Sequence, residues 1–463
     1  MNDWSGQKVV IIGAARQGAA LARYLAGKGA LVILNDQRSC EALEDARHVL
    51  ADLVNAGKAI WVCGGHPLEL LDGADLLCPS GGVPLTIPLV QEALRRGIPL
   101  SNDSQIFLEA CPCRSLGITG SAGKTTTTTL LGRMARAAFG NDKVWVGGNI
   151  GLPLISMLDQ MKPDHLAVIE LSSFQLEIMT CMVNIAAVLN VTPNHLDRHA
   201  SMDAYTAAKA QIITLQQPGE PAVLGRDDPG AWGLCSLAQG EVFSFGLQRP
   251  QQGEGTFVDD AGNLSWWDGH AAQPLLPRQS IQLRGEHNLQ NVLAACAMAH
   301  LAGVSPEAMR QAVDGFTGVP HRLELVRRLH GVAWYNDSIA TAPERAMADL
   351  RSFDEPLVLL AGGRDKNLPW QAFAELVHQR VDHLVVFGEA SEKILRAVGV
   401  TLPGSRPFTL DRCQGLQEAV LVAAQRAESG DVVLLSPGGT SFDEFRDFEE
   451  RGEAYRRWVL ELS

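Results

Sequence analysis

The feature that most constrains this chain is a glycine-rich loop at residues 117–125, which reads Gly-Ile-Thr-Gly-Ser-Ala-Gly-Lys-Thr. An apolar run precedes the loop, and a long stretch with helical spacing follows it. Backbone N–H groups of such a loop can face phosphate oxygens at a helix N-terminus, where the helix dipole favours negative charge. Lys124 would then reach the outer phosphates of a nucleoside triphosphate, and the Thr125 hydroxyl would bind Mg²⁺. The loop therefore predicts a strand–loop–helix unit in a parallel α/β sheet, although Ile118 stands where the strict pattern has glycine.

The overall composition narrows the class of protein. With 463 residues, 46% of them hydrophobic and 20% charged, the chain has the size of about three globular domains. Its net charge of −13 argues against general affinity for nucleic acid or an anionic membrane. The N-terminus lacks a secretory signal, and no apolar stretch reaches the ~18 residues of a membrane span. Because the nine cysteines are scattered and coiled-coil repeats are absent, we expect a cytoplasmic monomer with reduced thiols.

The N-terminal segment has the pattern of a nucleotide-binding βαβ unit. Residues 8–15 predict a buried parallel strand, residues 18–28 a helix, and residues 31–34 a second strand that ends at Asn35-Asp36. Gly13 and Gly18 fit the dinucleotide fingerprint, but Ala15 replaces its middle glycine. The segment therefore predicts a Rossmann-like fold and gives only weak support to NAD.

Two further segments follow along the chain. Apolar runs at residues 165–171 and 185–191 predict more parallel strands beside the loop-bearing one. The stretch at 240–284 is rich in Gly and Gln, with short alternating runs that predict a small antiparallel patch. From residue 319 a hairpin-like stretch leads into alternating strands and helices, which indicates another parallel sheet. We expect an α/β protein of three domains: Rossmann-like at 1–110, phosphate-loop ATPase-like with the antiparallel patch at 111–318, and Rossmann-like at 319–463.

Polar residues end two of the expected central strands. Glu170 follows Leu-Ala-Val-Ile, and Asn190 follows Ala-Ala-Val-Leu and leads to His195. In open α/β sheets, ligands bind beyond the carboxyl ends of the strands. Glu170 and His195 are therefore placed where a metal ion or a phosphate group would bind.

Several short sequences extend this pattern along the chain. They are Gly-Ser-Ala-Gly-Lys-Thr at 120–125, Glu-Leu-Ser-Ser-Phe-Gln-Leu-Glu at 170–177, Asn-Val-Thr-Pro-Asn-His-Leu-Asp-Arg-His at 190–199, Gly-Glu-His-Asn-Leu-Gln-Asn at 285–291, Val-Pro-His-Arg-Leu-Glu at 319–324 and Tyr-Asn-Asp-Ser at 335–338. In this order and at this spacing they resemble the Mur ligase family. The run Leu-Ser-Pro-Gly-Gly-Thr-Ser-Phe-Asp-Glu-Phe-Arg-Asp-Phe-Glu-Glu-Arg-Gly at 435–452 is most similar to the glutamate-adding members. The resemblance covers essentially the whole chain.

The resemblance implies an ATP-dependent acid–amino-acid ligase of peptidoglycan precursor synthesis. A carboxylate of UDP-N-acetylmuramoyl-L-alanine would take the γ-phosphoryl group of ATP, and the amine of D-glutamate would then displace phosphate from the acyl phosphate. The uridine nucleotide would bind the N-terminal domain, ATP the central one and glutamate the C-terminal one. The implied partners are thus small molecules, with ATP and two Mg²⁺ ions.

The resemblance also assigns site residues. It implies catalytic roles for Lys124, Glu170, His195, Lys209 and Arg322, and metal ligation by Thr125, Glu170, His195 and Lys209. Lys209 would be carbamylated, because a carbamate replaces a repelling cation beside the metals with an anion. The implied ATP-binding residues are Gly120, Ser121, Ala122, Gly123, Lys124, Thr125, Thr126, Asn288, Asn291, Arg322 and Asp337. The implied substrate-binding residues are Ala14, Ala15, Arg16, Asp36, Arg38, Asn149 and His195, with Thr341, Lys366, Ser441, Phe442 and Phe448 for glutamate.

Two residues depart from the family pattern, and some alternatives stay open. Ala122 stands where the loop usually has Asn, and Ile339 stands where a lysine is common, so one cation near the substrate is missing. The sequence does not separate D- from L-glutamate as the added amino acid. A non-catalytic nucleotide-binding protein and an NAD oxidoreductase are weaker alternatives. The Asp-Asn-Pro-Arg element of diamino-acid-adding ligases is absent, and folate polyglutamyl ligases lack the N-terminal domain.

Overall fold

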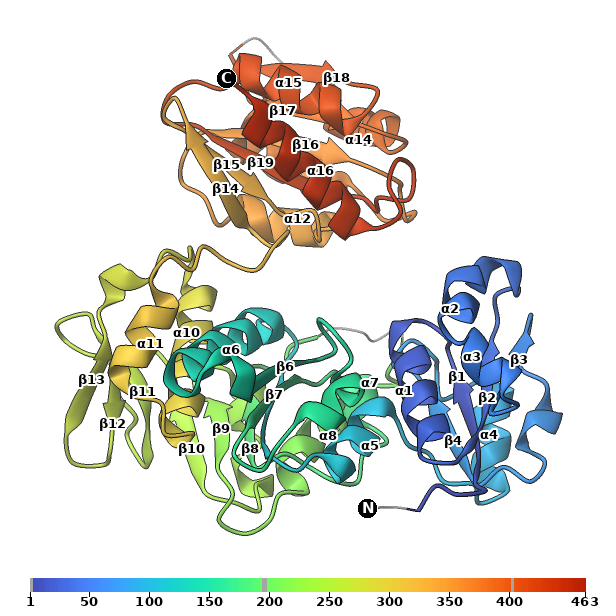
Figure 1. Cartoon of the computed structure of the whole chain (residues 1–463). Helices are drawn as coiled ribbons and strands as arrows, with labels where there is room; N and C mark the ends of the chain where they lie inside the picture. Colours follow the sequence, from blue (N-terminus) through green and yellow to red (C-terminus); the bar gives the residue numbers. More distant parts are fainter. Residues whose placement is uncertain (1–2, 194–197, 401–403) are drawn as a thin grey trace. The chain divides into compact units, whose positions relative to one another are not determined.

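The chain forms two compact units, each described here by itself. The computed structural model describes residues 3–193, 198–400 and 404–463. One unit comprises Met1–Gln282 with Glu286–Gly315, and the other Leu283–Gly285 with Phe316–Ser463. The first unit holds two sheets and the second holds one (Figure 1). Among the described residues, none of the helices is long and apolar enough to cross a membrane.

The N-terminal part of the first unit is a four-stranded parallel sheet in the order β3-β2-β1-β4. Side chains alternate along each strand, so Val9 and Ile11 pack in the cluster with the first helix, and Val10 and Ile12 pack in the cluster with α4. The elements are β1 Lys8–Ile12, α1 Arg16–Gly27, β2 Leu31–Asp36, α2 Glu44–Val49, α3 Ala51–Asn55, β3 Ala59–Cys63, β4 Leu76–Pro79, α4 Pro88–Arg95 and α5 Asp103–Ala110.

The rest of the first unit is built on a nine-stranded sheet in the order β13-β12-β11-β10-β9-β8-β5-β7-β6. Strands from β6 to β11 pair in parallel, and β11, β12 and β13 pair antiparallel. The antiparallel patch therefore continues the main sheet at one edge. The elements are β5 Arg114–Thr119, α6 Lys124–Phe139, β6 Val144–Gly148, β7 Leu166–Glu170, α7 Ser173–Leu176, β8 Ile185–Val188, α8 Met202–Thr214, β9 Ala222–Gly225, α9 Pro229–Trp232, β10 Val242–Phe245, β11 Glu254–Val258, β12 Leu264–Trp267, β13 Ala272–Leu276, α10 Glu286–Leu301 and α11 Pro306–Val313.

The second unit has a six-stranded sheet in the order β14-β15-β19-β16-β17-β18, parallel except for β14. Alternate strand residues build two cores, one shared with α12, α13 and α14 and the other with α15 and α16. The elements are β14 Glu324–Leu329, β15 Val332–Asn336, α12 Pro343–Leu350, β16 Leu357–Gly362, α13 Gln371–Arg380, β17 Val381–Phe387, α14 Ser391–Val398, β18 Thr409–Arg412, α15 Leu416–Arg426, β19 Val432–Gly438 and α16 Phe448–Glu461.

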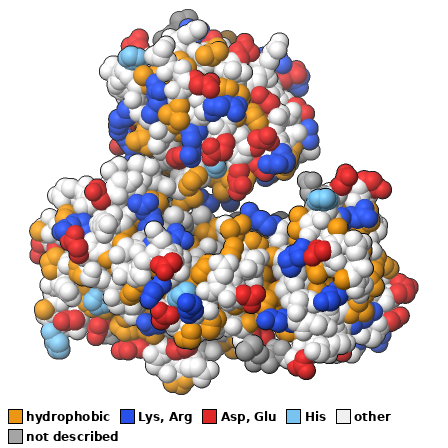
Figure 2. All heavy atoms as spheres, viewed as in Figure 1, with side chains coloured by type: hydrophobic (Ala, Val, Ile, Leu, Met, Phe, Trp, Pro, Cys, Tyr) orange, Lys and Arg blue, Asp and Glu red, His pale blue; other side chains and the backbone are white. Residues whose placement is uncertain are grey.

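The predicted α/β class, with parallel sheets and an antiparallel patch, is confirmed, and the expectation of reduced thiols is wrong for one pair of cysteines. Cys40 and Cys63 form a disulfide, with Cα atoms 5.5 Å apart, rather than two free thiols. They meet because the loop after β2 returns beside the end of β3. Acidic and basic side chains are interspersed over both units on the face shown in Figure 2.

Candidate active site

The phosphate-binding loop lies between β5 and α6, as the sequence predicts. β5 ends at Thr119, and α6 begins at Lys124. The Lys124 ammonium lies over the loop, where Nζ donates to the carbonyl oxygen of Gly120 at 2.8 Å. The first N–H groups of a helix have no acceptor within the helix. Together with Lys124 they make this end of α6 suited to an anionic group.

Gly123 brings the loop against Asn291, one of the two asparagines predicted to bind ATP. Its φ is 81°, in the left-handed region, and an added Cβ would lie 2.1 Å from Oδ1 of Asn291. Only glycine avoids both the backbone strain and the clash. Asn291 belongs to α10 and donates from Nδ2 to Oδ1 of Asn288 at 3.1 Å. The loop and the two predicted ATP-binding asparagines therefore belong to one site.

The segment after β8 holds the loop from the side. The Ser121 hydroxyl donates to the carbonyl oxygen of Thr192 at 3.0 Å and accepts the Thr192 N–H at 2.9 Å. Oδ1 of Asn190 accepts the Ala122 N–H at 2.8 Å, and its Nδ2 donates to the Ala122 carbonyl at 3.2 Å. Because both contacts use the backbone of Ala122, the departure at this position leaves them intact. This segment leads to His195, which lies outside the described residues.

Glu170 is the acidic centre of the site. It ends β7, is 2% exposed, and accepts from Thr125 Oγ1 on Oε2 at 2.9 Å and from Asn149 Nδ2 on Oε1 at 3.2 Å. A hydroxyl and a carboxylate so close fit Mg²⁺, which usually takes one or two carboxylates and completes its shell with phosphates and water. Within the described ranges no group of three or more His, Cys, Asp or Glu could hold a metal.

Lys209 lies beside this cluster and is 1% exposed. Its Nζ donates to the carbonyl oxygen of Gly120 at 2.9 Å and lies 4.7 Å from the ring centroid of Tyr205. Burial, with a smaller effect of the Lys124 cation, lowers the pKa of Lys209 to about 6, while the Glu170 charge opposes the shift. The amine is therefore mostly uncharged at pH 7, unlike a solvent-exposed lysine.

The residues predicted to bind the uridine nucleotide lie together in the N-terminal sheet. Asp36 ends β2 and accepts the Ala14 N–H on Oδ2 at 2.9 Å. Arg38 pairs with both Asp36 oxygens, at 3.0 and 2.9 Å, and this pairing lowers the pKa of the Asp36 carboxyl. Ala15 caps α1 and Arg16 begins it. The structure thus gathers all five predicted residues around one helix N-terminus.

The predicted glutamate-side residues follow three neighbouring strands of the second unit. Thr341 follows β15, Lys366 follows β16, and Ser441 and Phe442 follow β19, while Phe448 begins α16. The Lys366 Nζ donates to the Thr341 hydroxyl at 3.3 Å. Ser441 is buried, whereas Phe442 is 59% exposed. The carboxyl ends of parallel strands bring these residues to one edge of the sheet.

Arg345, in the first turn of α12, is a cation that the sequence analysis missed. Desolvation and the Arg345 charge together lower the pKa of Lys366. Arg345 also interacts with the Asp337 and Asp349 carboxyls. Burial raises the pKa of both, and the neighbouring Asp337 raises the pKa of Asp349 further. Arg345 thus adds a second cation beside Lys366 at this edge of the sheet. No sequence motif indicates Arg345. The signal that could have indicated it is its position in the first turn of the helix that follows Thr341.

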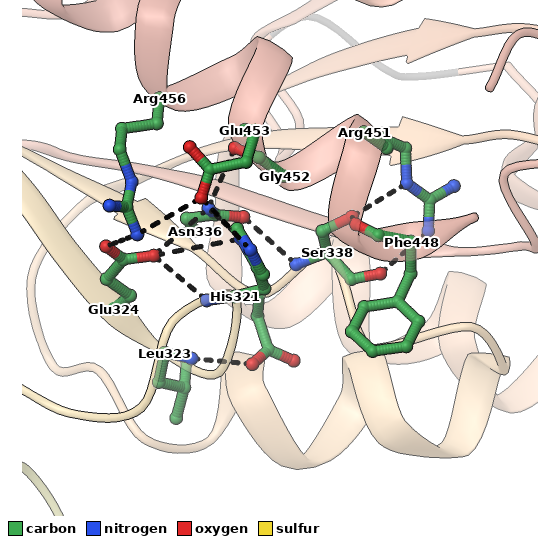
Figure 3. Close-up of polar contacts among 11 residues, drawn as sticks. His321, Leu323, Glu324, Asn336, Ser338, Phe448, Arg451, Gly452, Glu453 and Arg456 are labelled. Atoms are coloured by element: carbon green, nitrogen blue, oxygen red, sulfur yellow. Dashed lines mark hydrogen bonds and ion pairs between the residues drawn. The ribbon is translucent and has the colours of Figure 1, made fainter. Parts of the chain in front are cut away.

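Arg322 lies in a tight turn between two residues with left-handed backbone, His321 at φ 62° and Leu323 at φ 42°. Its side chain interacts with the predicted nucleotide-binding residue Asp337. Nearby, the buried Arg451 donates to the Ser338 hydroxyl at 2.9 Å and to the Gly439 carbonyl at 3.1 Å. Arg451 therefore ties the loop after β15 to the loop after β19. Figure 3 shows its contact with Ser338.

Comparison with known proteins identifies the family. Residues 118–299 match the Mur ligase middle domain, and residues 321–439 match the Mur ligase, glutamate ligase domain. A UDP-N-acetylmuramoylalanine–D-glutamate ligase from Symbiobacterium thermophilum is 40% identical over 457 residues, 99% of this chain and 98% of the relative. A ligase of the same name from Acidobacterium capsulatum is 39% identical, over 99% of this chain and 97% of its own. The chain belongs to the Mur ligase family.

A solved Mur ligase confirms the fold of this one. UDP-N-acetylmuramate–alanine ligase from Thermotoga maritima superposes with a TM-score of 0.57 at 18% identity, over 98% of this chain and 99% of that one. The likeness confirms the three-domain α/β architecture. The phosphate-loop cluster lies in the first unit, and the strand-end cluster of predicted glutamate-side residues lies in the second.

Proposed function

We propose that this Mur ligase joins D-glutamate to UDP-N-acetylmuramoyl-L-alanine and converts ATP to ADP and phosphate. The proposal is supported by end-to-end relatives that carry this ligase name. The observation that carries it is the contact between Thr125 and Glu170 beside the phosphate-binding loop, because it places a hydroxyl and a carboxylate where nucleotide phosphates would bind. Such a small-molecule ligase would act in the cytoplasm, and we propose that it does so as a monomer.

The reaction brings two anions together. A carboxylate oxygen of the UDP substrate attacks the γ-phosphorus, the bond to the β-phosphate oxygen breaks, and ADP leaves. The glutamate amine then attacks the acyl carbon, and the tetrahedral intermediate collapses with loss of a proton and of phosphate. Lys124 and Arg322 would offset the phosphate charge during both steps. Bound Mg²⁺ would neutralise further charge, held by Thr125 and Glu170, with His195 as a proposed ligand of a second ion.

The remaining predicted residues receive roles by position. We propose that residues 1–110 bind the UDP substrate, 111–318 bind ATP and 319–463 bind glutamate. The proposed UDP-substrate contacts are Ala14, Ala15, Arg16, Asp36, Arg38 and Asn149. The proposed ATP contacts are residues 120–126 with Asn288, Asn291, Arg322 and Asp337. The proposed glutamate contacts are Thr341, Lys366, Ser441, Phe442 and Phe448, and Arg345 would supply a cation near the position where Ile339 replaces the family's lysine.

Carbamylation of Lys209 is a finer part of the proposal. The Nζ lone pair would attack the carbon of CO₂, and loss of one proton would give an anionic carbamate. Its lowered pKa of about 6 supports this reaction, because only an uncharged amine is nucleophilic. We expect ¹³CO₂ to give a carbamate carbonyl resonance that Lys209→Ala lacks. We also expect short carboxylates to restore part of the lost activity of this variant, and no restoration would argue against a carbamate.

The function is tested by weighing the product. The protein is incubated with ATP, Mg²⁺ and UDP-N-acetylmuramoyl-L-alanine, and with each glutamate enantiomer separately. We expect the glutamyl product only with D-glutamate, and no product in the Lys124→Ala or Glu170→Ala variants that retain the fold. Product with L-glutamate alone would identify the other enantiomer as substrate, and no product or ADP with either would indicate a non-catalytic nucleotide-binding protein.

A further inference from the structure

The turn that carries Arg322 is held in an unusual backbone conformation. His321 and Leu323, on either side of Arg322, have φ values of 62° and 42°, and neither is glycine. Residues with side chains adopt this region only when their surroundings enforce it. The contacts of these two residues therefore show what fixes the direction of Arg322.

Two carboxylates accept the backbone N–H groups of the turn. The His321 N–H donates to Oε2 of Glu324 at 2.9 Å, and the Leu323 N–H donates to Oδ1 of Asp337 at 2.6 Å. Both acceptors are charged or strongly polar and partly or fully buried, where such hydrogen bonds are stronger than in water. The turn is thus pinned on both sides of Arg322 (Figure 3).

Asn336, at the end of β15, joins the same group. Its Nδ2 lies 3.0 Å from His321 Nδ1, 3.2 Å from Glu324 Oε2 and 3.1 Å from the Gly452 carbonyl oxygen. The Asn336 amide nitrogen can only donate, so His321 Nδ1 accepts this hydrogen bond. The proton of the neutral ring is then on Nε2, which lies 3.4 Å from Oε1 of Glu453. Asn336 therefore fixes both the ring and the carboxylate that hold the turn.

Helix α16 closes the group from outside. Arg456 pairs with Oε1 of Glu324, the oxygen that does not serve the His321 N–H. The His321 ring packs so closely on α16 that a Cβ on Gly452 would lie 2.1 Å from Nδ1. A glycine at this point of α16 thus makes room for the ring. These contacts come from residues far apart in sequence and converge on one turn (Figure 3).

Arg322 itself has a free donor. Its Nε is buried and makes no hydrogen bond to any described residue. A buried donor without an acceptor is costly unless a ligand supplies one. The turn thus holds a guanidinium that is oriented before its partner arrives, which lowers the entropy lost on binding.

We infer that Glu324 and Asn336, held by Arg456 and Gly452 of α16, are positioning residues that fix the turn bearing Arg322 for contact with the transferred phosphoryl group. This inference rests on the proposed function, because it takes the phosphate of ATP as the anion that Arg322 meets. Glu324 and Asn336 touch no substrate in this scheme and act only through Arg322.

Steady-state kinetics of a double-mutant cycle test the inference. We expect Glu324→Ala to lower kcat and raise the KM for ATP, at least ~10-fold in kcat/KM, with the KM for the UDP substrate within about two-fold. Arg456→Met should lower kcat/KM for ATP less than Glu324→Ala does. Arg456→Lys keeps the cation and should therefore keep the kcat/KM of the unmodified protein. In an Arg322→Ala background, Glu324→Ala should cost almost nothing further, because the two residues act as one unit. Fully additive losses would overturn the inference.

Hydrogen exchange provides a readout that does not depend on catalysis. We expect Glu324→Ala and Arg456→Met to speed exchange of the His321 and Leu323 amides at least ~10-fold while the sheet amides of β16 and β17 keep their protection. The matched control is Glu392→Gln, which removes a carboxylate paired with Arg396 in α14 and should change neither exchange nor kinetics. Unchanged exchange at the turn would overturn the inference even if ligation fails. Absence of ligation by the unmodified protein, with faster exchange in the variants, would instead overturn only the proposed function.

Discussion

At the scale of one residue, burial of Lys209 lowers the free energy of unfolding at neutral pH. Its side chain is 1% exposed, and burial lowers its pKa from an ordinary 10.5 to about 6. At pH values between about 6 and 10.5, Lys209 binds a proton in the unfolded chain but not in the folded protein. Stability should therefore rise with pH across this window, by up to ~1.4 kcal/mol per pH unit from this one group.

Replacing Lys209 should reveal that contribution. In CO₂-free buffer, we expect Lys209→Met to be more stable than the unmodified protein at pH 7, by a few kcal/mol on the order of the shift in its pKa. The difference should shrink steadily as pH rises toward 10.5, because the lysine of the unfolded chain loses its proton only around that pH. Chemical denaturation of both proteins from pH 6.5 to 9.5 measures it. Parallel stability curves would show that Lys209 keeps its proton when folded.

At the scale of elements, the site is assembled where strands end and helices begin. Glu170 closes β7, Asn190 follows β8, and Lys124 opens α6. The contact between Gly123 and Asn291 then joins the loop to α10, which begins more than 150 residues later in the chain. The geometry of the loop therefore depends on tertiary packing as well as on its own sequence.

Gly123→Ala tests that dependence. The added Cβ would meet Asn291 at 2.1 Å in a left-handed backbone, so we expect ATP affinity to fall at least ~10-fold as the loop or Asn291 moves. The matched control is Gly97→Ala, which has φ 71° and open space around the new Cβ. It should lose only about 1–2 kcal/mol of stability and keep ATP affinity. Calorimetric titration with ATP measures both, and equal affinities would contradict a tight Gly123–Asn291 contact.

Much of this element structure could be predicted from the sequence, since long apolar runs indicate buried strands. The phosphate loop and the hairpin of β14 and β15 lie where the patterns place them, and strands alternate with helices after that hairpin as expected. Strands β3 and β18 and helices α14 and α16 were missed: β3 and β18 are short and partly exposed, α14 has only eight residues, and α16 is highly charged. The left-handed turn at His321 could not be foreseen, because it depends on Asn336 and α16, which reach it only through the fold.

The same limit applies to the site. Motifs indicate the residues that we propose to contact ligands, such as Lys124, Glu170 and Lys366. They do not indicate Arg345 or Glu324, whose importance comes from neighbours brought by other elements. The Cys40–Cys63 disulfide was missed for the same reason, since a separation of 23 residues carries no pairing information by itself.

At the scale of the whole molecule, an acidic chain carries local groups of cations. Its net charge is −13, yet Lys124, Arg322, Arg345 and Lys366 lie in the two clusters assigned to phosphate and carboxylate groups. An acidic protein with local cations would attract anionic substrates only at those clusters. The central claim is that these cations let a carboxylate attack the γ-phosphate of ATP.

Isotope transfer measures this step most directly. UDP-N-acetylmuramoyl-L-alanine labelled with ¹⁸O in its carboxylate is converted with unlabelled ATP and D-glutamate, and the phosphate released is weighed. If an acyl phosphate forms, one carboxylate oxygen leaves with the phosphorus, so we expect a single ¹⁸O in each phosphate. Phosphate free of ¹⁸O, released together with the glutamyl product, would contradict attack by the carboxylate on ATP.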